Sequence, residues 1–177
     1  MHCFLHLTNW FSNLRGPTTT EADRVAVEYL VKAAEIADVE ELVMGMFEAK
    51  SDTNGLPART VVLTDFKEFA LGDQRIGIGV AETLKPDLLI KRKDELRQAS
   101  FGVKEEHKLD LMFFIIVDVH HMKSYIVGLS DAEETVIVGA FKTKVVEQHL
   151  YDVGNKVSRK KDFLPALSKY FRVAPVK

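Results

Sequence analysis

Residues 111–119 read LMFFIIVDV, an apolar run that a single acidic residue interrupts near its end. A strand with one solvated face alternates apolar and polar side chains, whereas an unbroken apolar run is typical of a strand buried on both faces. Such a strand lies in the interior of a sheet that helices cover on both sides. The run therefore predicts an α/β fold, a mixed β-sheet flanked by helices.

Other strand patterns surround this run. Lys67–Leu71 and Arg75–Val80 are predicted strands joined by a short Gly-Asp turn, and Ser124–Leu129 is a third. Gly77 and Gly79 lie inside the second of these strands. A glycine inside a strand weakens it and often marks the close approach of another backbone.

Helical patterns separate the strands. Thr18–Glu21 is a capping box that begins the first helix, Val39–Phe47 has helical spacing, and Pro86 begins a long helix that extends to about Lys108. Residues 57–64 and 131–141 contain β-branched runs, and each fits either a helix or a strand.

Composition limits the classes of function. The 177 residues carry a net charge of -2, without the broad basic excess of a general nucleic-acid or membrane binder, so an anion site must be local. The single cysteine, Cys3, excludes an internal disulfide framework and suits a reducing compartment. No run reaches the roughly 18 apolar residues of a membrane helix. We therefore expect a cytoplasmic protein that binds neither nucleic acid nor membrane.

Three consecutive cations, Arg159, Lys160 and Lys161, precede the last helical pattern. Pro165 is best tolerated in a first turn, so the regular helix is predicted to begin near Asp162. A helix N-terminus carries a partial positive charge, so three cations beside it are unfavourable unless an anion also binds there. Backbone N–H groups and these side chains would then converge on a phosphate-like group. A solvated basic turn is the alternative.

Two further groups are candidates. Lys67 lies between two phenylalanines and points to the opposite face of an extended segment, although a solvated lysine is the simpler interpretation. Asp118-Val119-His120-His121 has residue types that bind divalent metal ions. Adjacent side chains on extended backbone point apart, so a turn between two strands is favoured there over a metal site.

Five motifs taken together resemble the DHHA2 domain, the C-terminal domain of manganese-dependent family II inorganic pyrophosphatases. In order along the chain they are PTTTE (17–21), MFEAKSD (46–52), DFKEF (65–69), GIGVAET (77–83) and VSRKK (157–161). We therefore predict that residues 16–177 form a DHHA2 substrate-binding domain. Residues 1–15 would be a residual N-terminal segment or the end of a missing catalytic domain. Exopolyphosphatases and prune-type proteins share this domain.

The resemblance implies a division of labour. The family's N-terminal DHH domain holds manganese or magnesium ions, and the C-terminal domain closes over pyrophosphate. Substrate-binding roles fall on Lys67, Arg159 and Lys160, of which the arginine can bind phosphate bidentately. The resemblance assigns no catalytic residue, metal ligand or cofactor to this chain itself. It belongs to a hydrolase family, but we expect it to be inactive without a DHH domain, supplied in the same chain or in another.

The sequence departs from the family in three places. The metal-binding domain is absent, and Asp118–His121 is not its aspartate-histidine-histidine motif. Thr8–Phe11 contains no acid where the family has a metal-ligating aspartate. Asp162 replaces a glutamine, and it either caps the helix or pairs with Arg159 or Lys160 and weakens anion binding. Two other functions remain open, a non-catalytic module that binds phosphate, polyphosphate or a protein, and the equivalent domain of an exopolyphosphatase.

Overall fold

The computed structural model describes residues 19–53 and 55–172, so the predictions for residues 1–15, Cys3, Thr8–Phe11 and Thr18 lie outside the described residues. The chain divides into two compact units, Met1–Asp52 and Thr53–Lys177, each described here by itself. Within the described part, no helix is both long enough and apolar enough to cross a membrane.

The first unit contains α1 (Glu21–Ala33) and α2 (Val39–Ser51). The capping box that begins α1 is formed by Thr20 and Asp23, whose side chains each accept the other residue's backbone N–H, at 3.3 and 2.8 Å. The observed cap thus lies two residues after the predicted one, Thr18, which is outside the described residues. Thr18 and Thr20 each have an acid three residues onward, so the sequence pattern alone does not choose between them.

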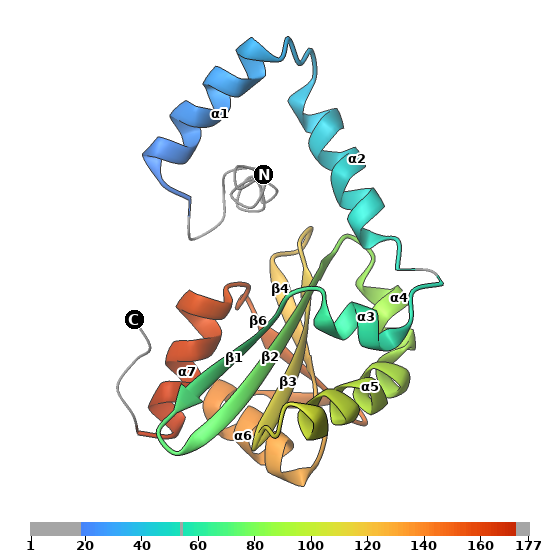
Figure 1. Ribbon diagram of the computed structural model, residues 1–177, viewed down its shortest axis with the longest axis vertical. Helices are drawn as coiled ribbons and strands as arrows, with labels where there is room; N and C mark the ends of the chain where they lie inside the picture. The colour runs from blue at the N-terminus through green and yellow to red at the C-terminus, as the bar shows by residue number, and fades with distance from the viewer. Residues whose placement is uncertain (1–18, 54, 173–177) are drawn as a thin grey trace. The chain divides into compact units, whose positions relative to one another are not determined.

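A six-stranded sheet in the order β1-β2-β3-β4-β6-β5 forms the centre of the second unit (Figure 1). β2 and β3 pair in parallel, and the other neighbours pair antiparallel. All eight residues of β3 are buried, which confirms the interior strand predicted from residues 111–119. The strands are β1 (Phe66–Leu71), β2 (Gln74–Thr83), β3 (Leu111–Asp118), β4 (Lys123–Val127), β5 (Lys144–Glu147) and β6 (Leu150–Gly154).

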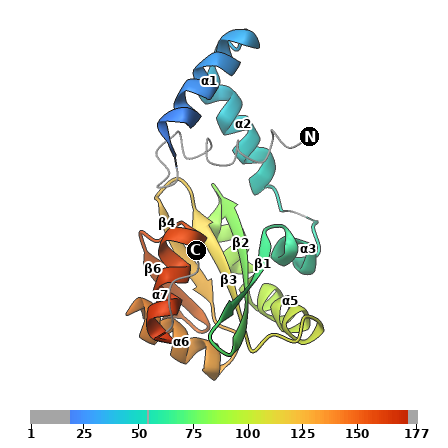
Figure 2. The same cartoon turned by 60° about the vertical axis from the view of Figure 1, so that its left-hand side comes forward.

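Helices cover both faces of this sheet (Figure 2). One face carries α3 (Ala58–Leu63), α4 (Pro86–Lys91) and α5 (Lys93–Glu106), and the other carries α6 (Asp131–Phe141) and α7 (Leu164–Tyr170). Both β-branched segments that the sequence left open are thus helical.

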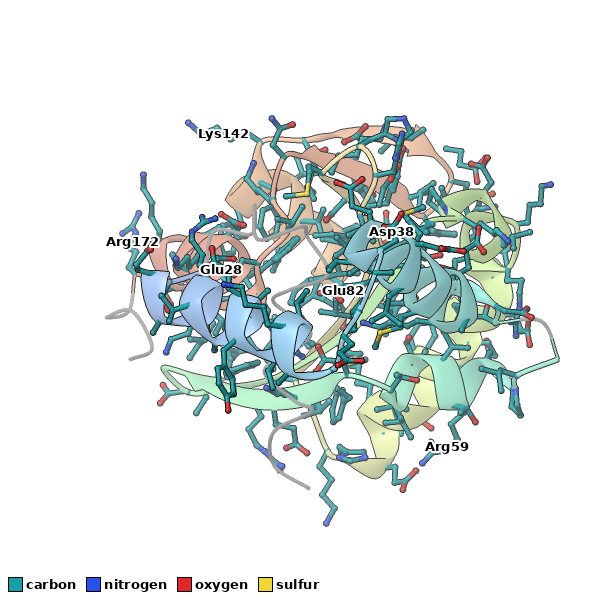
Figure 3. All side chains as sticks on the ribbon, turned by 90° about the horizontal axis from the view of Figure 1, so that it is seen from above. Glu28, Asp38, Arg59, Glu82, Lys142 and Arg172 are labelled. Carbon is teal, nitrogen blue, oxygen red and sulfur yellow. The ribbon has the colours of Figure 1, made fainter. Side chains whose placement is uncertain are left out.

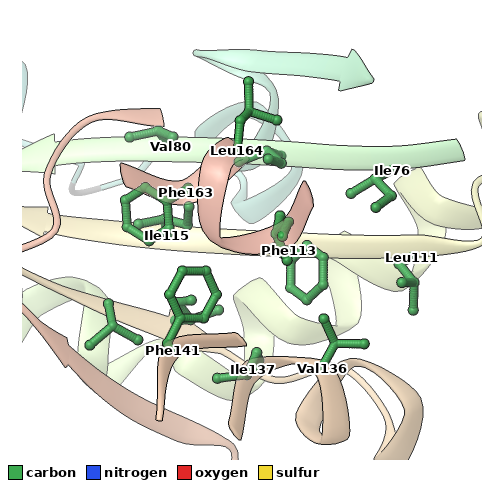
Figure 4. Packing of buried hydrophobic residues seen from close by; sticks show 14 of the residues in the cluster. Ile76, Val80, Leu111, Phe113, Ile115, Val136, Ile137, Phe141, Phe163 and Leu164 are labelled. Atoms are coloured by element: carbon green, nitrogen blue, oxygen red, sulfur yellow. The ribbon is translucent and has the colours of Figure 1, made fainter. Parts of the chain in front are cut away.

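Alternate residues of β3 supply the two cores. Phe113 and Ile115 pack with α6 and α7 in a cluster we call the α7-side core (Figure 4). Phe114 and Ile116 pack on the opposite face with α3, α4 and α5, in the α5-side core. Each of these four side chains is at most 2% exposed, so the sheet is enclosed on both sides at its centre.

The long helix predicted from Pro86 is broken at Arg92 into α4 and α5. The Arg92 guanidinium donates hydrogen bonds to the backbone carbonyls of Thr53 and Leu56, at 3.0 and 2.8 Å. A second arginine, Arg59, projects from α3 (Figure 3). Its guanidinium pairs with the Glu106 carboxylate at 2.6 Å. These contacts join the helices of this layer to one another and to the segment that precedes α3.

Gly79 of β2 is pressed against another backbone, as its position in the strand predicted. A Cβ atom built there would lie 2.7 Å from the carbonyl oxygen of Val62. We expect Gly79→Ala to lower the free energy of unfolding by about 1–3 kcal/mol, because the backbone of α3 must move away. Urea denaturation measures the change. Gly102→Ala is the control, since a Cβ there meets nothing within 4 Å, and equal stability of the two variants would contradict the expectation.

Candidate functional site

The cationic motif forms a π-helical turn, η2 (Arg159–Phe163), that leads directly into α7. Regular α-helix therefore begins at Leu164, two residues later than the predicted Asp162, with Pro165 in its first turn as expected. Ser158 caps the turn, and its hydroxyl accepts the Lys161 N–H at 3.2 Å. The cations lie at the N-terminal end of the last helix, as predicted. They form a π-helical turn, however, and regular α-helix follows it.

The side chain of Asp162, a residue of the turn itself, caps the N-terminal end of the turn. One carboxylate oxygen accepts the backbone N–H groups of Val157, at 3.0 Å, and Ser158, at 2.8 Å. The Ser158 carbonyl in turn accepts the N–H groups of Asp162 and Phe163. Of the two alternatives for Asp162, capping is the one observed. These four N–H groups have partners within the turn, so the predicted convergence of backbone N–H groups on an anion does not hold for them. The side chains of the turn remain as the candidate ligands for an anion.

Arg159 is clamped across the first two strands. One terminal nitrogen, Nη1, donates to the carbonyls of Asp65 and Ile78 at 2.8 and 3.0 Å, and Nη2 donates to the Asp65 carboxylate. The Arg159 side chain is only 12% exposed. These bonds use three of the five N–H donors of a guanidinium and leave its Nε edge for another acceptor. Asp65 was not predicted as a site residue, although it stands two positions before Lys67 in the DFKEF motif.

The structure places Lys67 next to this clamp in the sheet. Lys67 pairs with Ile78 across β1 and β2, and paired residues of an antiparallel ladder point to the same face. Ile78 belongs to the α7-side core, and its carbonyl is one of the acceptors that hold Arg159. The DFKEF segment and the cationic turn, which are distant in sequence, thus meet on one face of the sheet. The side chains of Lys67 and Lys160 are both exposed.

The other members of the DFKEF motif have structural partners. Phe66 packs on the α5-side core and Phe69 on the α7-side core. Lys67 therefore lies opposite Phe66 only, and the prediction that it faces away from both phenylalanines is wrong, because residues two apart on a strand share a face. Glu68 binds the Nδ1 atom of His107 at 2.8 Å, and this hydrogen bond is the main reason that the pKa of Glu68 lies below its ordinary value. Within residues 19–53 and 55–172, Lys67 has neither a side-chain hydrogen bond nor an ion pair. Its ammonium is therefore available to a ligand.

Asp118–His121 forms the end of β3 and the turn to β4. The buried Asp118 carboxylate accepts the N–H of His121 at 3.0 Å and contacts its Nδ1 atom at 2.8 Å. The rings of His120 and His121 stand edge to face, 4.7 Å apart. Among the described residues, no group of three or more His, Cys, Asp or Glu side chains could hold a metal ion. The segment is a turn, the interpretation that the sequence favoured.

The fold and this site define an α/β domain that gathers cationic side chains at a turn beside the first two strands. Residues 44–170 match the sequence model of the DHHA2 domain, and the chain belongs to the DHHA2 family. This membership confirms the resemblance seen in the five motifs.

Similar proteins agree on the family. The chain is 39% identical over 171 residues to a probable manganese-dependent inorganic pyrophosphatase of Deinococcus radiodurans, covering 90% of this chain and 52% of that protein. It is 27% identical to the manganese-dependent inorganic pyrophosphatase of Methanocaldococcus jannaschii. The crystal structure of a putative family II inorganic pyrophosphatase from Methanococcus jannaschii matches with a TM-score of 0.76 and 25% identity, over 89% of this chain and 50% of that one. The predicted fold class is confirmed, and the chain spans about half the length of these relatives.

Proposed function

We propose that this chain is the pyrophosphate-binding part of a manganese-dependent inorganic pyrophosphatase, which with water splits pyrophosphate into two phosphates. The observation that carries the proposal is the clamped Arg159, held by Asp65 and by the carbonyl of Ile78, the strand partner of Lys67. The names of the similar proteins support pyrophosphate as the substrate class. A cytoplasmic setting belongs to the same proposal.

The clamp supplies the geometry that binding requires. Pyrophosphate carries several negative charges, and phosphoryl transfer depends on positioning and on neutralising charge. With Nη1 and one Nη2 donor used, Arg159 keeps the Nε and Nη2 donors on one edge, an arrangement that binds two oxygens in parallel. Lys67 and Lys160 add point charges. Because Arg159 is held before the ligand arrives, less side-chain freedom is lost on binding.

A second domain has to complete the site. The described residues of this chain include no group of side chains able to hold manganese or magnesium. In the proposal, a DHH domain in the same chain or in another provides those ions, which supply an activated hydroxide when bound. The residues of this chain bind and orient the substrate.

We expect this chain alone, with millimolar manganese, to release phosphate from pyrophosphate no faster than a blank of metal without protein. The physical reason is that its described residues include no group of side chains that could hold the metal ions that generate the nucleophile. A phosphate-release assay measures the rate. Turnover well above the blank would contradict the proposed division of labour.

The positive arm of the test uses a chimera. This chain replaces the matching half of the Deinococcus radiodurans relative, and the proposal requires pyrophosphatase activity of the product. Lys160→Ala should lower kcat/KM by about tenfold or more, as expected for a lost charge-assisted contact. Lys161→Ala is the matched control, because Lys161 is an exposed cation of the same turn. A folded but inactive chimera would reject the proposal, and cleavage of tripolyphosphate alone would point to an exopolyphosphatase.

A further inference from the structure

A separate cleft of about 690 Å³ opens at the end of the sheet, between α4 and the turn that joins β3 to β4. β2 and β3 are parallel, and their carboxyl ends, at Thr83 and Asp118, meet at this edge. Ligands of α/β sheets commonly bind in the crevice outside the carboxyl ends of strands. The position alone makes the cleft a candidate binding site.

Three lysines line the cleft, namely Lys85, Lys91 and Lys123. Lys85 and Lys91 have no ion-pair partner in the part of the chain that the structure describes. Lys123 lies 3.7 Å from Asp152, and its ammonium stands 4.8 Å from the centre of the Tyr125 ring. The interaction with the Tyr125 side chain is the main reason that the pKa of Lys123 is raised, which favours the cationic form of the lysine.

The pair of Asp118 and His121 forms part of the lining. Asp118 is 2% exposed and faces the Nδ1 atom of His121, whereas the His121 side chain is 66% exposed. A carboxylate on Nδ1 orients the ring and leaves Nε2 directed away from it. The exposed ring of His121, rather than the buried carboxylate of Asp118, is therefore the part of this pair that a ligand in the cleft can reach.

This cleft is distinct from the clamp. Leu89 of α4 and Tyr125 of β4 pack on the α5-side core. Ile78, the strand partner of Lys67, and Phe163, which follows the cationic turn, belong to the α7-side core. The two groups of cations therefore lie on opposite faces of the sheet.

We propose that this cleft binds a multivalent oxyanion, inorganic phosphate or a polyphosphate, at a site separate from Lys67, Arg159 and Lys160. Lys85 and Lys91 offer two ammonium groups without an ion-pair partner among the described residues, more charge than one monovalent carboxylate can neutralise, whereas a phosphoryl group brings two or more negative charges. Asp87 also lines the cleft and opposes binding. The inference does not depend on the proposed function, since it concerns other residues on the other face of the sheet.

Isothermal titration of the 177-residue chain tests the inference, with inorganic phosphate and tripolyphosphate as separate ligands. In the double variant Lys67→Ala/Lys160→Ala, binding to the cleft should persist. Adding Lys85→Ala and Lys91→Ala should weaken it by about tenfold or more, because two charge-assisted contacts are lost. Asp87→Asn should instead tighten it by roughly threefold, since a like charge is removed. Lys169→Ala, an exposed cation of α7, is the matched control and should change nothing.

The His121 side chain reports where the ligand binds. Its ring ¹⁵N resonances should shift during titration of the Lys67→Ala/Lys160→Ala variant and stay unchanged when Lys85 and Lys91 are also replaced. Saturation by phosphate alone identifies a site for a single phosphoryl group, and saturation by tripolyphosphate alone identifies a chain-binding site. Unshifted His121 resonances, or binding unaffected by loss of Lys85 and Lys91, would overturn the inference. That result would leave the proposed pyrophosphatase role untouched, because the chimera assay tests that role independently.

Discussion

Arg159→Lys in the active chimera is expected to lower kcat/KM for pyrophosphate by about 10²–10³-fold, the usual loss when a preorganised charged donor is removed. Lysine keeps the charge but has no planar fork. It cannot bond Asp65 and Ile78 while presenting two parallel donors to a substrate. Steady-state kinetics with manganese measure the change.

Two companion variants separate the roles of charge and clamp. Asp65→Asn leaves both backbone acceptors of Arg159 in place and removes the ion pair, so we expect a smaller loss, about tenfold. Lys161→Arg keeps the charge of the turn and should retain full activity. Thermal unfolding of each variant confirms that the fold is intact. An Arg159→Lys chimera with unchanged kcat/KM would show that the guanidinium does not contact the substrate.

Glu133→Ala is expected to lower the free energy of unfolding by about 3–5 kcal/mol, as for other buried ion pairs that lose one partner. Glu133 is 0% exposed. One oxygen accepts the Lys104 ammonium at 2.6 Å and the Met112 N–H at 3.2 Å, and the other accepts the hydroxyl of Ser130. The carboxylate thereby links α5 and α6, which cover opposite faces of the sheet.

Urea denaturation measures this effect. Glu105→Ala on the exposed surface of α5 is the control and should change stability by less than about 0.5 kcal/mol. Glu133→Gln keeps the shape and the acceptor oxygen but not the charge, so its loss should be intermediate. A Glu133→Ala protein as stable as the control would mean that Lys104 and the Met112 N–H find other partners.

The sequence predicted the centre of the fold better than its periphery. The unbroken apolar run of β3 and the glycines of β2 have local signatures, and both predictions were confirmed. Residues 57–64 stayed ambiguous because two β-branched valines suit either state. They are helical since Ala58, Val61 and Val62 together face the α5-side core, a contact with residues distant in sequence. The break at Arg92 likewise depends on carbonyls more than thirty residues earlier in the chain.

The candidate site shows the same division. Lys67, Arg159 and Lys160 were selected by resemblance, and their roles as ligands stay predictions. The clamp on Arg159 was not predictable, because two of its acceptors are backbone carbonyls, which every residue has whatever its side chain. The capping role of Asp162 was one of two alternatives, and only the path of the turn decided between them. The pairing of Asp118 with His121, three residues apart, was not predicted although a turn was expected there, because the geometry of the turn decides which side chains it brings together.

The clamp also sets an order of assembly on the ribosome. Translation delivers Asp65 and Ile78 long before Arg159, so the hairpin of β1 and β2 emerges without the guanidinium that later fastens it. Among the described strands, β1 lies at the edge of the sheet and pairs with β2 alone. The bonds that Arg159 makes to Asp65 and Ile78 can therefore form only after the SRKK segment has been synthesised. The contacts that hold β1 at this edge of the sheet are therefore completed only when the segment that leads into the last helix is present.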